Sequence, residues 1–196
     1  MRSSNDRKVL VVDNYDSFTY NLVHIVEEIL EEEVDVFRND EIPWNEIESY
    51  SHIILSPGPG IPDEAGELKA LISRYGPSKK MMGVCLGLQA IGEVYGGELK
   101  NLDKVYHGVS TTMELTEVQS PIFEGIDNEF EAGRYHSWVI IPSSLPEVLE
   151  ITATDKSGEI MAIQHKSEKV YGVQFHPESI MTPQGREMIE NFLNIE

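Results

Sequence analysis

The residues in this chain that could do chemistry centre on its single cysteine, Cys85. It lies in the stretch Gly83-Val-Cys-Leu-Gly87, after a short apolar run and before apolar residues at helical spacing. This pattern predicts a sharp strand-to-helix turn, the nucleophile elbow, in which flanking side chains would clash with the backbone. The free N–H groups and partial positive charge of a helix start stabilise a thiolate. We therefore expect a nucleophile here rather than a buried structural cysteine, which is the alternative.

A nucleophile needs a base, and the stretch Tyr171-Gly-Val-Gln-Phe-His-Pro-Glu178 offers one. Its alternation of apolar residues with Gln174 predicts a strand that ends near His176. Residues two apart on a strand point to the same side, so Glu178 would lie beside His176 and orient its imidazole. We expect Cys85, His176 and Glu178 to act together as a catalytic triad. For His176 taken alone, a structural role is the alternative.

A third motif, Ser56-Pro-Gly-Pro-Gly-Ile-Pro62, follows an apolar run that predicts a buried strand. Its density of proline and glycine excludes regular structure and predicts a rigid loop. Glycine N–H groups in such a loop are not shielded by side chains, and the carboxyl end of a strand is a common place for an anion or oxyanion site. The alternative is a simple turn.

Strand and helix patterns alternate through the first half of the chain, which predicts a parallel sheet with helices on both faces. After Gly97 the pattern changes to short strands separated by turns, which predicts an antiparallel extension. We expect an α/β three-layer sandwich forming a single domain over residues 1–196. The expected strands are 9–12, 34–37, 52–55, the run before Cys85, 110–115, 139–141, 148–153 and 160–165, and the expected helices are 18–29, 68–75, 88–95 and one starting at Thr182-Pro183.

The composition narrows the function classes. Thirty-four acidic residues against fifteen basic ones give a net charge of −19, which argues against nucleic-acid binding. No apolar run reaches membrane-spanning length, and the run at 9–12, which follows a polar start at Met1–Lys8, is too short for a signal peptide. A lone cysteine forms no intrachain disulfide, so we expect a cytoplasmic protein. The six histidines are scattered, and we expect no metal site.

Together, the Ser56–Gly60, Gly83–Gln89 and Gly172–Ser179 motifs resemble the class I glutamine amidotransferases, over nearly the whole chain. The opening stretch Asp13-Asn-Tyr-Asp-Ser-Phe-Thr-Tyr-Asn-Leu22 is similar to the glutaminase subunits of anthranilate synthase and aminodeoxychorismate synthase. The stretches Tyr135-His-Ser137 and Thr182-Pro-Gln-Gly185 fit the same branch. The resemblance implies hydrolysis of L-glutamine to glutamate and ammonia, without a cofactor.

The resemblance also implies roles for individual residues. Cys85 would attack the glutamine amide, His176 would move the protons and Glu178 would orient His176. The N–H groups of Leu86 and Gly58 would hold the oxyanion. The amino-acid end of glutamine would contact Gln89 and the backbone at Ser137 and Trp138. The full set of expected substrate-binding residues is Gly58, Pro59, Gly60, Leu86, Gln89, Ser137 and Trp138.

A chorismate-binding synthase subunit is the implied partner, in a hetero-oligomer, most simply for anthranilate and tryptophan synthesis. Its expected contacts are Asn14, Tyr15, Asp16, Ser17 and His107. Two positions depart from the pattern: Trp138 stands where most relatives have leucine, and Val109 stands where the chorismate branch usually has lysine. A helix cap with no further role is the alternative for the 13–20 turn.

Other functions fit part of the pattern. Aminodeoxychorismate synthesis for folate would use the same glutaminase chemistry. An esterase or peptidase with cysteine in the elbow fits the order of nucleophile and histidine, but leaves the Pro-Gly loop and Gln89 unexplained. A non-catalytic relative that only binds a partner conflicts with the intact Cys85, His176 and Glu178.

Overall fold

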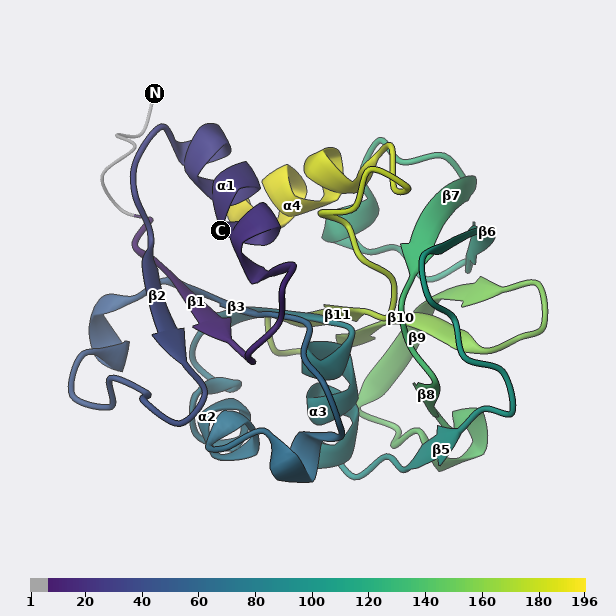
Figure 1. The fold of residues 1–196 in the computed structure, drawn as a ribbon, viewed down its shortest axis with the longest axis horizontal. Coiled ribbons are helices and arrows are strands. Elements are labelled where there is room, and N and C mark those ends of the chain that lie inside the picture. The colour runs from purple at the N-terminus through teal and green to yellow at the C-terminus, as the bar shows by residue number, and fades with distance from the viewer. Residues whose placement is uncertain (1–6) are drawn as a thin grey trace.

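The computed structural model describes residues 7–196, so the polar start at 1–6 lies outside the described residues. Their largest sheet is nine-stranded, with the order β2-β1-β3-β4-β11-β10-β9-β6-β7 (Figure 1). The strands, in chain order, are β1 (Val9–Asp13), β2 (Asp35–Arg38), β3 (His52–Leu55), β4 (Lys80–Val84), β6 (Val109–Leu115), β7 (Glu129–Arg134), β9 (Leu149–Asp155), β10 (Ile160–His165) and β11 (Val170–Val173).

Helices cover both faces of this sheet, as the alternating pattern predicted. Figure 1 shows α1 and α4 on one face and α2 and α3 on the other. Two buried hydrophobic clusters fill the layers, one on each side of the sheet, because apolar runs such as β1 and β3 bury side chains on both faces. The helices are α1 (Thr19–Leu30), α2 (Leu68–Tyr75), α3 (Leu86–Val94) and α4 (Gly185–Leu193).

The sheet divides into two halves, and the predicted fold class is confirmed. Strands β2, β1, β3, β4 and β11 are parallel. Strands β10, β9, β6 and β7 continue it in antiparallel pairs. One expected strand lies elsewhere, because β8 (Trp138–Ile140) pairs with β5 (Leu99–Asn101) in a separate two-stranded sheet. Both β5 and β7 were absent from the sequence prediction.

The predicted bounds need three corrections. Strand β11 ends at Val173: Gln174 N still bonds Met161 O of the neighbouring β10, but His176 N bonds Gly133 O of β7. Helix α4 begins at Gly185, because the Thr182 hydroxyl is occupied in a turn that holds His176, where it donates to the His176 carbonyl. Helix α1 begins at Thr19, with no side-chain cap.

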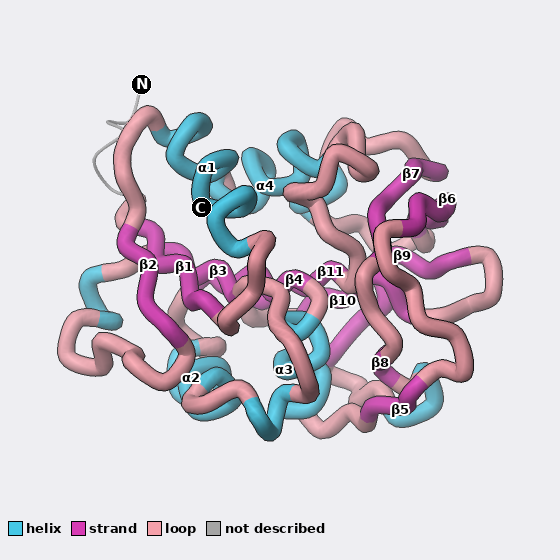
Figure 2. The backbone as a smooth tube through the Cα atoms, in the orientation of Figure 1, coloured by secondary structure: helices cyan, strands magenta, loops and turns pink. Residues whose placement is uncertain are grey.

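The parallel half brings several loops to one edge of the sheet. The carboxyl ends of β1, β3 and β4 all face this edge, where ligands bind in open α/β sheets. The connections that follow β1 and β3 run side by side there (Figure 2), joined by the bond from Asn14 N to Ser56 Oγ at 2.8 Å. No helix of the described residues is long and apolar enough to cross a membrane.

Helix α3 approaches strands β3 and β4 at glycine positions. A Cβ on Gly83 would lie 2.4 Å from the backbone carbon of Gly87, and a Cβ on Gly87 would lie 2.6 Å from the carbonyl oxygen of Leu55. Both distances are shorter than a van der Waals contact. Any larger residue would therefore push the helix away from the sheet and from the turn that joins it to β4.

Gly83→Ala should therefore destabilise the protein. Because the clashing atoms belong to the backbone, we expect a loss toward the upper end of overpacking costs, about 3 kcal/mol, in urea unfolding. Gly158→Ala is the control: its added Cβ meets nothing within 4 Å, and its φ of +82° should cost only about 1 kcal/mol. A smaller loss for Gly83→Ala than for the control would show that strand and helix separate easily.

Candidate active site

Cys85 occupies the turn between β4 and α3 in the strained conformation expected of a nucleophile elbow. Its φ is 54° and its ψ is −102°, a region that residues with a side chain rarely adopt. Cys85 N donates to Val173 O at 2.8 Å, which ties the turn to β11. The side chain is only 6% exposed and receives a weak hydrogen bond from Gln174 Nε2 at 3.5 Å. The turn thus holds the sulfur at the start of α3.

His176 and Glu178 are brought together, although not by a strand as predicted. They lie beyond the end of β11, in a turn where Ser179 N donates to His176 O at 3.1 Å. His176 Nδ1 lies 2.6 Å from Glu178 Oε1, and both side chains are buried. The Thr182 hydroxyl accepts from Gly133 N and donates to the His176 carbonyl, so the histidine is fixed against the end of β7.

The charges of this pair favour a protonated imidazole. Burial lowers the pKa of His176, but contacts with Cys85 and Glu178 outweigh burial and raise it. Nε2 makes no hydrogen bond of good geometry with a described residue, so Cys85 raises the pKa of His176 through its charge. An imidazolium beside the sulfur stabilises a thiolate. The three groups can therefore supply a nucleophile and a proton carrier within one buried cluster.

A pocket of about 210 Å³ opens onto the sulfur and is lined by the predicted substrate contacts other than Leu86. The Pro-Gly loop forms one wall and the segment before and including Trp138 forms the other. Gly58 packs against Leu86, since a Cβ on this glycine would lie 2.7 Å from Leu86 Cδ2. The lining residues are Gly58, Pro59, Gly60, Cys85, Gln89, Tyr135, His136, Ser137 and Trp138.

The Gln89 side chain is held in one orientation at the floor of this pocket. Its Nε2 donates to the Trp138 carbonyl at 2.9 Å and to Gln174 Oε1 at 3.2 Å. An amide NH₂ has two hydrogens, so both are used. Gln89 Oε1 is thus the atom left to accept a hydrogen bond from a ligand.

A buried ion pair supports the opposite wall. Arg134 is 1% exposed; its Nη1 bonds Asp155 at 2.8 Å and its Nε donates to His136 Nε2 at 3.1 Å. Since guanidinium can only donate, His136 Nε2 must accept, so Nδ1 carries the hydrogen and donates to the Trp138 carbonyl at 3.1 Å. The ion pair therefore fixes one tautomer of His136 and, through it, the pocket wall. No local sequence pattern indicates this role for Arg134.

The predicted partner contacts lie close to the site but differ in accessibility. Tyr15 is 49% exposed, and its hydroxyl bonds the Asp40 carboxylate. Ser17 and His107 are exposed and Asp16 is half-buried. Asn14 is 2% exposed and bonded to Ser56, so any effect of a partner on it must be indirect.

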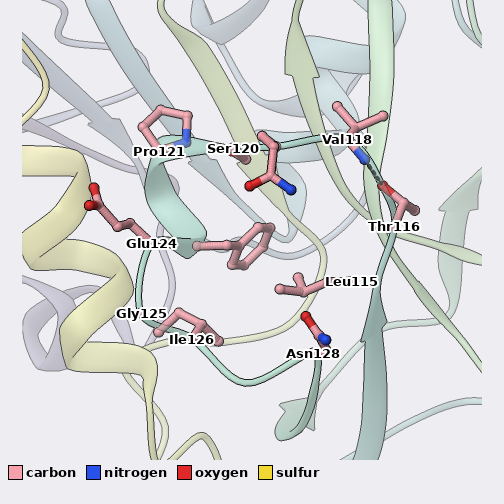
Figure 3. A pocket seen from close by; sticks show the side chains of 11 residues that line it. Leu115, Thr116, Val118, Ser120, Pro121, Glu124, Gly125, Ile126 and Asn128 are labelled. Atoms are coloured by element: carbon pink, nitrogen blue, oxygen red, sulfur yellow. Dashed lines mark hydrogen bonds between the residues drawn. The ribbon is translucent and has the colours of Figure 1, made fainter.

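A larger hollow of about 510 Å³ lies outside this site, at the end of β6 and the connection from β6 to β7 (Figure 3). The side chains of Leu115 and Ile126 point into it. Its described lining includes no cysteine, histidine, lysine or arginine, and Glu124 is the charged residue among them. This chemistry offers no nucleophile or proton carrier, so we place the active site at the smaller pocket.

The buried His136 should make the protein sensitive to acid. Burial, assisted by the charge of Arg134, lowers the pKa of His136 from 6.5 to about 3. Between these values the unfolded chain binds a proton that the folded chain does not. The free energy of unfolding therefore decreases as the pH is lowered, by up to about 1.4 kcal/mol per pH unit. In His136→Gln this contribution disappears, and urea unfolding from pH 6.5 to 3 should show a shallower decline.

The control is His24→Gln, because His24 is exposed on α1. It should leave the pH dependence as it is in the unsubstituted chain. An unchanged slope in His136→Gln would mean that His136 is protonated in the folded protein, which would contradict the tautomer assigned above.

Comparisons with known proteins agree with this geometry. The chain is 46% identical over 97% of its length to the bifunctional protein TrpGD of Thermotoga maritima, of which it covers 32%. It is 46% identical to aminodeoxychorismate/anthranilate synthase component 2 of Bacillus subtilis, with 94% of this chain and 95% of that protein covered. The structure of a Thermotoga maritima glutamine amidotransferase shares the fold, with a TM-score of 0.76 at 14% identity over 97% of this chain and 100% of that one. The family model for class-I glutamine amidotransferases matches residues 10–195, and the chain belongs to this family.

Proposed function

We propose that this chain is the glutaminase subunit of a chorismate-using synthase. It hydrolyses L-glutamine to glutamate and ammonia and passes the ammonia to a separate synthase subunit. The observation that carries this proposal is the pocket in which the Cys85 sulfur meets the Pro-Gly loop and Gln89, beside the His176–Glu178 pair. The membership of the class-I family supports the same reaction.

The reaction starts with attack of the Cys85 sulfur on the side-chain carbonyl of glutamine. The bond from sulfur to carbon forms, and the carbonyl oxygen becomes an oxyanion. His176 then gives its proton to the nitrogen, the C–N bond breaks and ammonia leaves, which produces a γ-glutamyl thioester. Water, activated by the neutral His176, attacks this thioester and releases glutamate.

Groups around the sulfur support each step. The Leu86 N–H, at the start of α3 where helix N–H groups lack intrahelical partners, and the N–H of Gly58 would hold the oxyanion. Glu178 holds Nδ1 of His176 and stabilises the imidazolium that carries the proton. Gln89 Oε1 would accept from the ammonium group of the substrate, and the Ser137–Trp138 backbone would complete its binding.

A partner is needed because free ammonia is mostly protonated near neutral pH, and ammonium is not a nucleophile. Making ammonia beside its acceptor avoids this loss. The name of the Bacillus subtilis relative, component 2 of a synthase, supports a separate synthase subunit in a hetero-oligomer. In the bifunctional Thermotoga maritima relative, the region that matches this chain is 32% of a longer chain. Other arrangements therefore exist among the relatives. Such a complex would be cytoplasmic.

Anthranilate is the product that we propose, which places the activity in tryptophan synthesis. The opening motif at 13–22 and the Tyr135-His-Ser137 motif support the chorismate branch. Aminodeoxychorismate for folate is the second candidate, and the Bacillus subtilis relative carries both names.

Cys85→Ser tests the division of labour between the two subunits. A hydroxyl is a far weaker nucleophile here than a thiolate, so glutamine-dependent synthesis by the complex should fall by about 10³-fold or more. Synthesis from added ammonia should keep its rate, because the acceptor site belongs to the partner. Loss of both activities would contradict the proposal.

The product decides the pathway. The chain is immobilised and used to capture its partner from a lysate of the source cells. Chorismate and glutamine are then added to the captured complex. We expect anthranilate, read by its fluorescence after chromatography. Aminodeoxychorismate would move the assignment to folate. Glutamate released without either product would mean another ammonia acceptor, and no glutamate would favour a non-catalytic relative.

A further inference from the structure

The turn between β1 and α1, residues 13–20, contacts both halves of the active site. On one side it meets the Pro-Gly loop. Asn14 N donates to Ser56 Oγ at 2.8 Å, and Asn14 Nδ2 donates to Ser56 O at 2.7 Å. A Cβ on Gly58 would lie 2.6 Å from Asn14 Cβ, so Asn14 fills the space behind this glycine. Movement of Asn14 would therefore move the loop.

On its other side the turn meets the histidine through Phe18. The ring centroid of Phe18 lies 5.6 Å from that of His176, edge to face, and 4.9 Å from that of Tyr135. Tyr135 itself lies 4.7 Å from His176. Two aromatic rings from separate segments thus contact the imidazole. The edge-to-face contact of Phe18 and the tilted contact of Tyr135 restrict the orientation of the imidazole as well as burying apolar surface.

These contacts matter because the imidazole has a single firm hydrogen bond. Nδ1 is held by Glu178, whereas Nε2, the nitrogen that must reach the substrate, has no well-formed bond to any described residue. One hydrogen bond leaves a ring free to tilt about it. Packing by Phe18 and Tyr135 therefore restricts the direction in which Nε2 points.

The turn behaves as one unit with an exposed outer side. Asp13 Oδ1 accepts from Tyr15 N at 2.9 Å and from Thr19 Oγ1 at 2.8 Å, which closes the turn on itself. Tyr15 and Tyr20 are 49% and 57% exposed. A molecule that presses on these two tyrosines would shift Asn14 and Phe18 together.

We propose that Phe18 is a positioning residue for His176, and that the 13–20 turn carries synthase binding to the imidazole through Phe18 and to the Pro-Gly loop through Asn14. This inference rests on the proposed glutaminase function, and it explains how activity could depend on the partner. Phe18 itself touches no substrate. It acts by holding the imidazole where its Nε2 can exchange a proton with the sulfur and the leaving nitrogen.

Substitution of Phe18 tests the proposal in the complex with the synthase. Phe18→Ala should lower kcat for glutamine-dependent synthesis by about 10- to 100-fold, the cost of a misplaced catalytic group. KM for glutamine and the rate with added ammonia should stay close to their original values. Phe18→Tyr keeps the ring edge and should restore kcat, whereas Phe18→Leu should lie between the two.

A second readout uses the chain alone and needs no glutamine. The rate of Cys85 alkylation by iodoacetamide, measured against pH, reports the thiolate that His176 stabilises. The profile should shift in Phe18→Ala and be restored in Phe18→Tyr. Phe123→Ala is the matched control, because the Phe123 ring packs against Phe130 and, among the described residues, has no ring contact with Tyr135 or His176. It should leave the profile unchanged, and circular dichroism checks that each variant folds.

Three outcomes overturn the inference or separate it from the proposed function. An unchanged alkylation profile together with an unchanged kcat would show that Phe18 does not position His176. Loss of the ammonia-dependent rate as well would assign Phe18 to docking instead. If the unsubstituted complex releases no glutamate, the proposed function fails, but the alkylation profile still decides whether Phe18 orients the imidazole.

Discussion

The close approach of β4 to α3 is the constraint on which the site depends. Because Gly83 meets the backbone of Gly87, the chain has room for only a very sharp turn between them. Cys85 must then adopt a positive φ of 54°, which a residue with a side chain disfavours. The surrounding sheet has to supply the energy for this strain, through buried strands on both sides of β4. The sulfur is consequently fixed relative to β11, the strand from which the histidine segment continues.

A second constraint is that the side-chain N–H groups of Gln89 and His136 beside the pocket are all used. The buried guanidinium of Arg134 can only donate, so it sets the tautomer of His136, and His136 and Gln89 then both donate to the Trp138 carbonyl. Each group has one orientation left. Such a network binds a ligand through the few polar atoms that remain free. A small pocket can therefore be specific although its side chains keep one orientation.

The sequence was sufficient for chemistry that depends on local motifs, and insufficient where distant strands decide. Cys85 was found because an elbow needs glycines at fixed spacing. The contact of His176 with Glu178 was predicted for the wrong reason, since β11 ends at Val173 and a turn joins them. The role of Arg134 could not be predicted, because its ion pair with Asp155 forms only when β7 and β9 both pair with β6. No local sequence pattern reveals this pairing. Strand β7 itself alternates between exposed and buried residues only from Glu129 to Ala132, and its last residues are all buried.

The positions of Asn14 and Phe18 suggest why a turn next to the site suits control by a partner better than the site itself. The backbone turn that carries Cys85 is fixed by close packing and by the bond from Cys85 N to Val173 O, so small forces would not change it. The imidazole and the Pro-Gly loop, in contrast, are each supported from one side by a turn whose outer surface is exposed. Two supports on one rigid turn would move together, because Asp13 closes it with bonds to both ends. Binding of the synthase to the exposed side of the turn would therefore move the Pro-Gly loop and His176 together, while Cys85 stays in place.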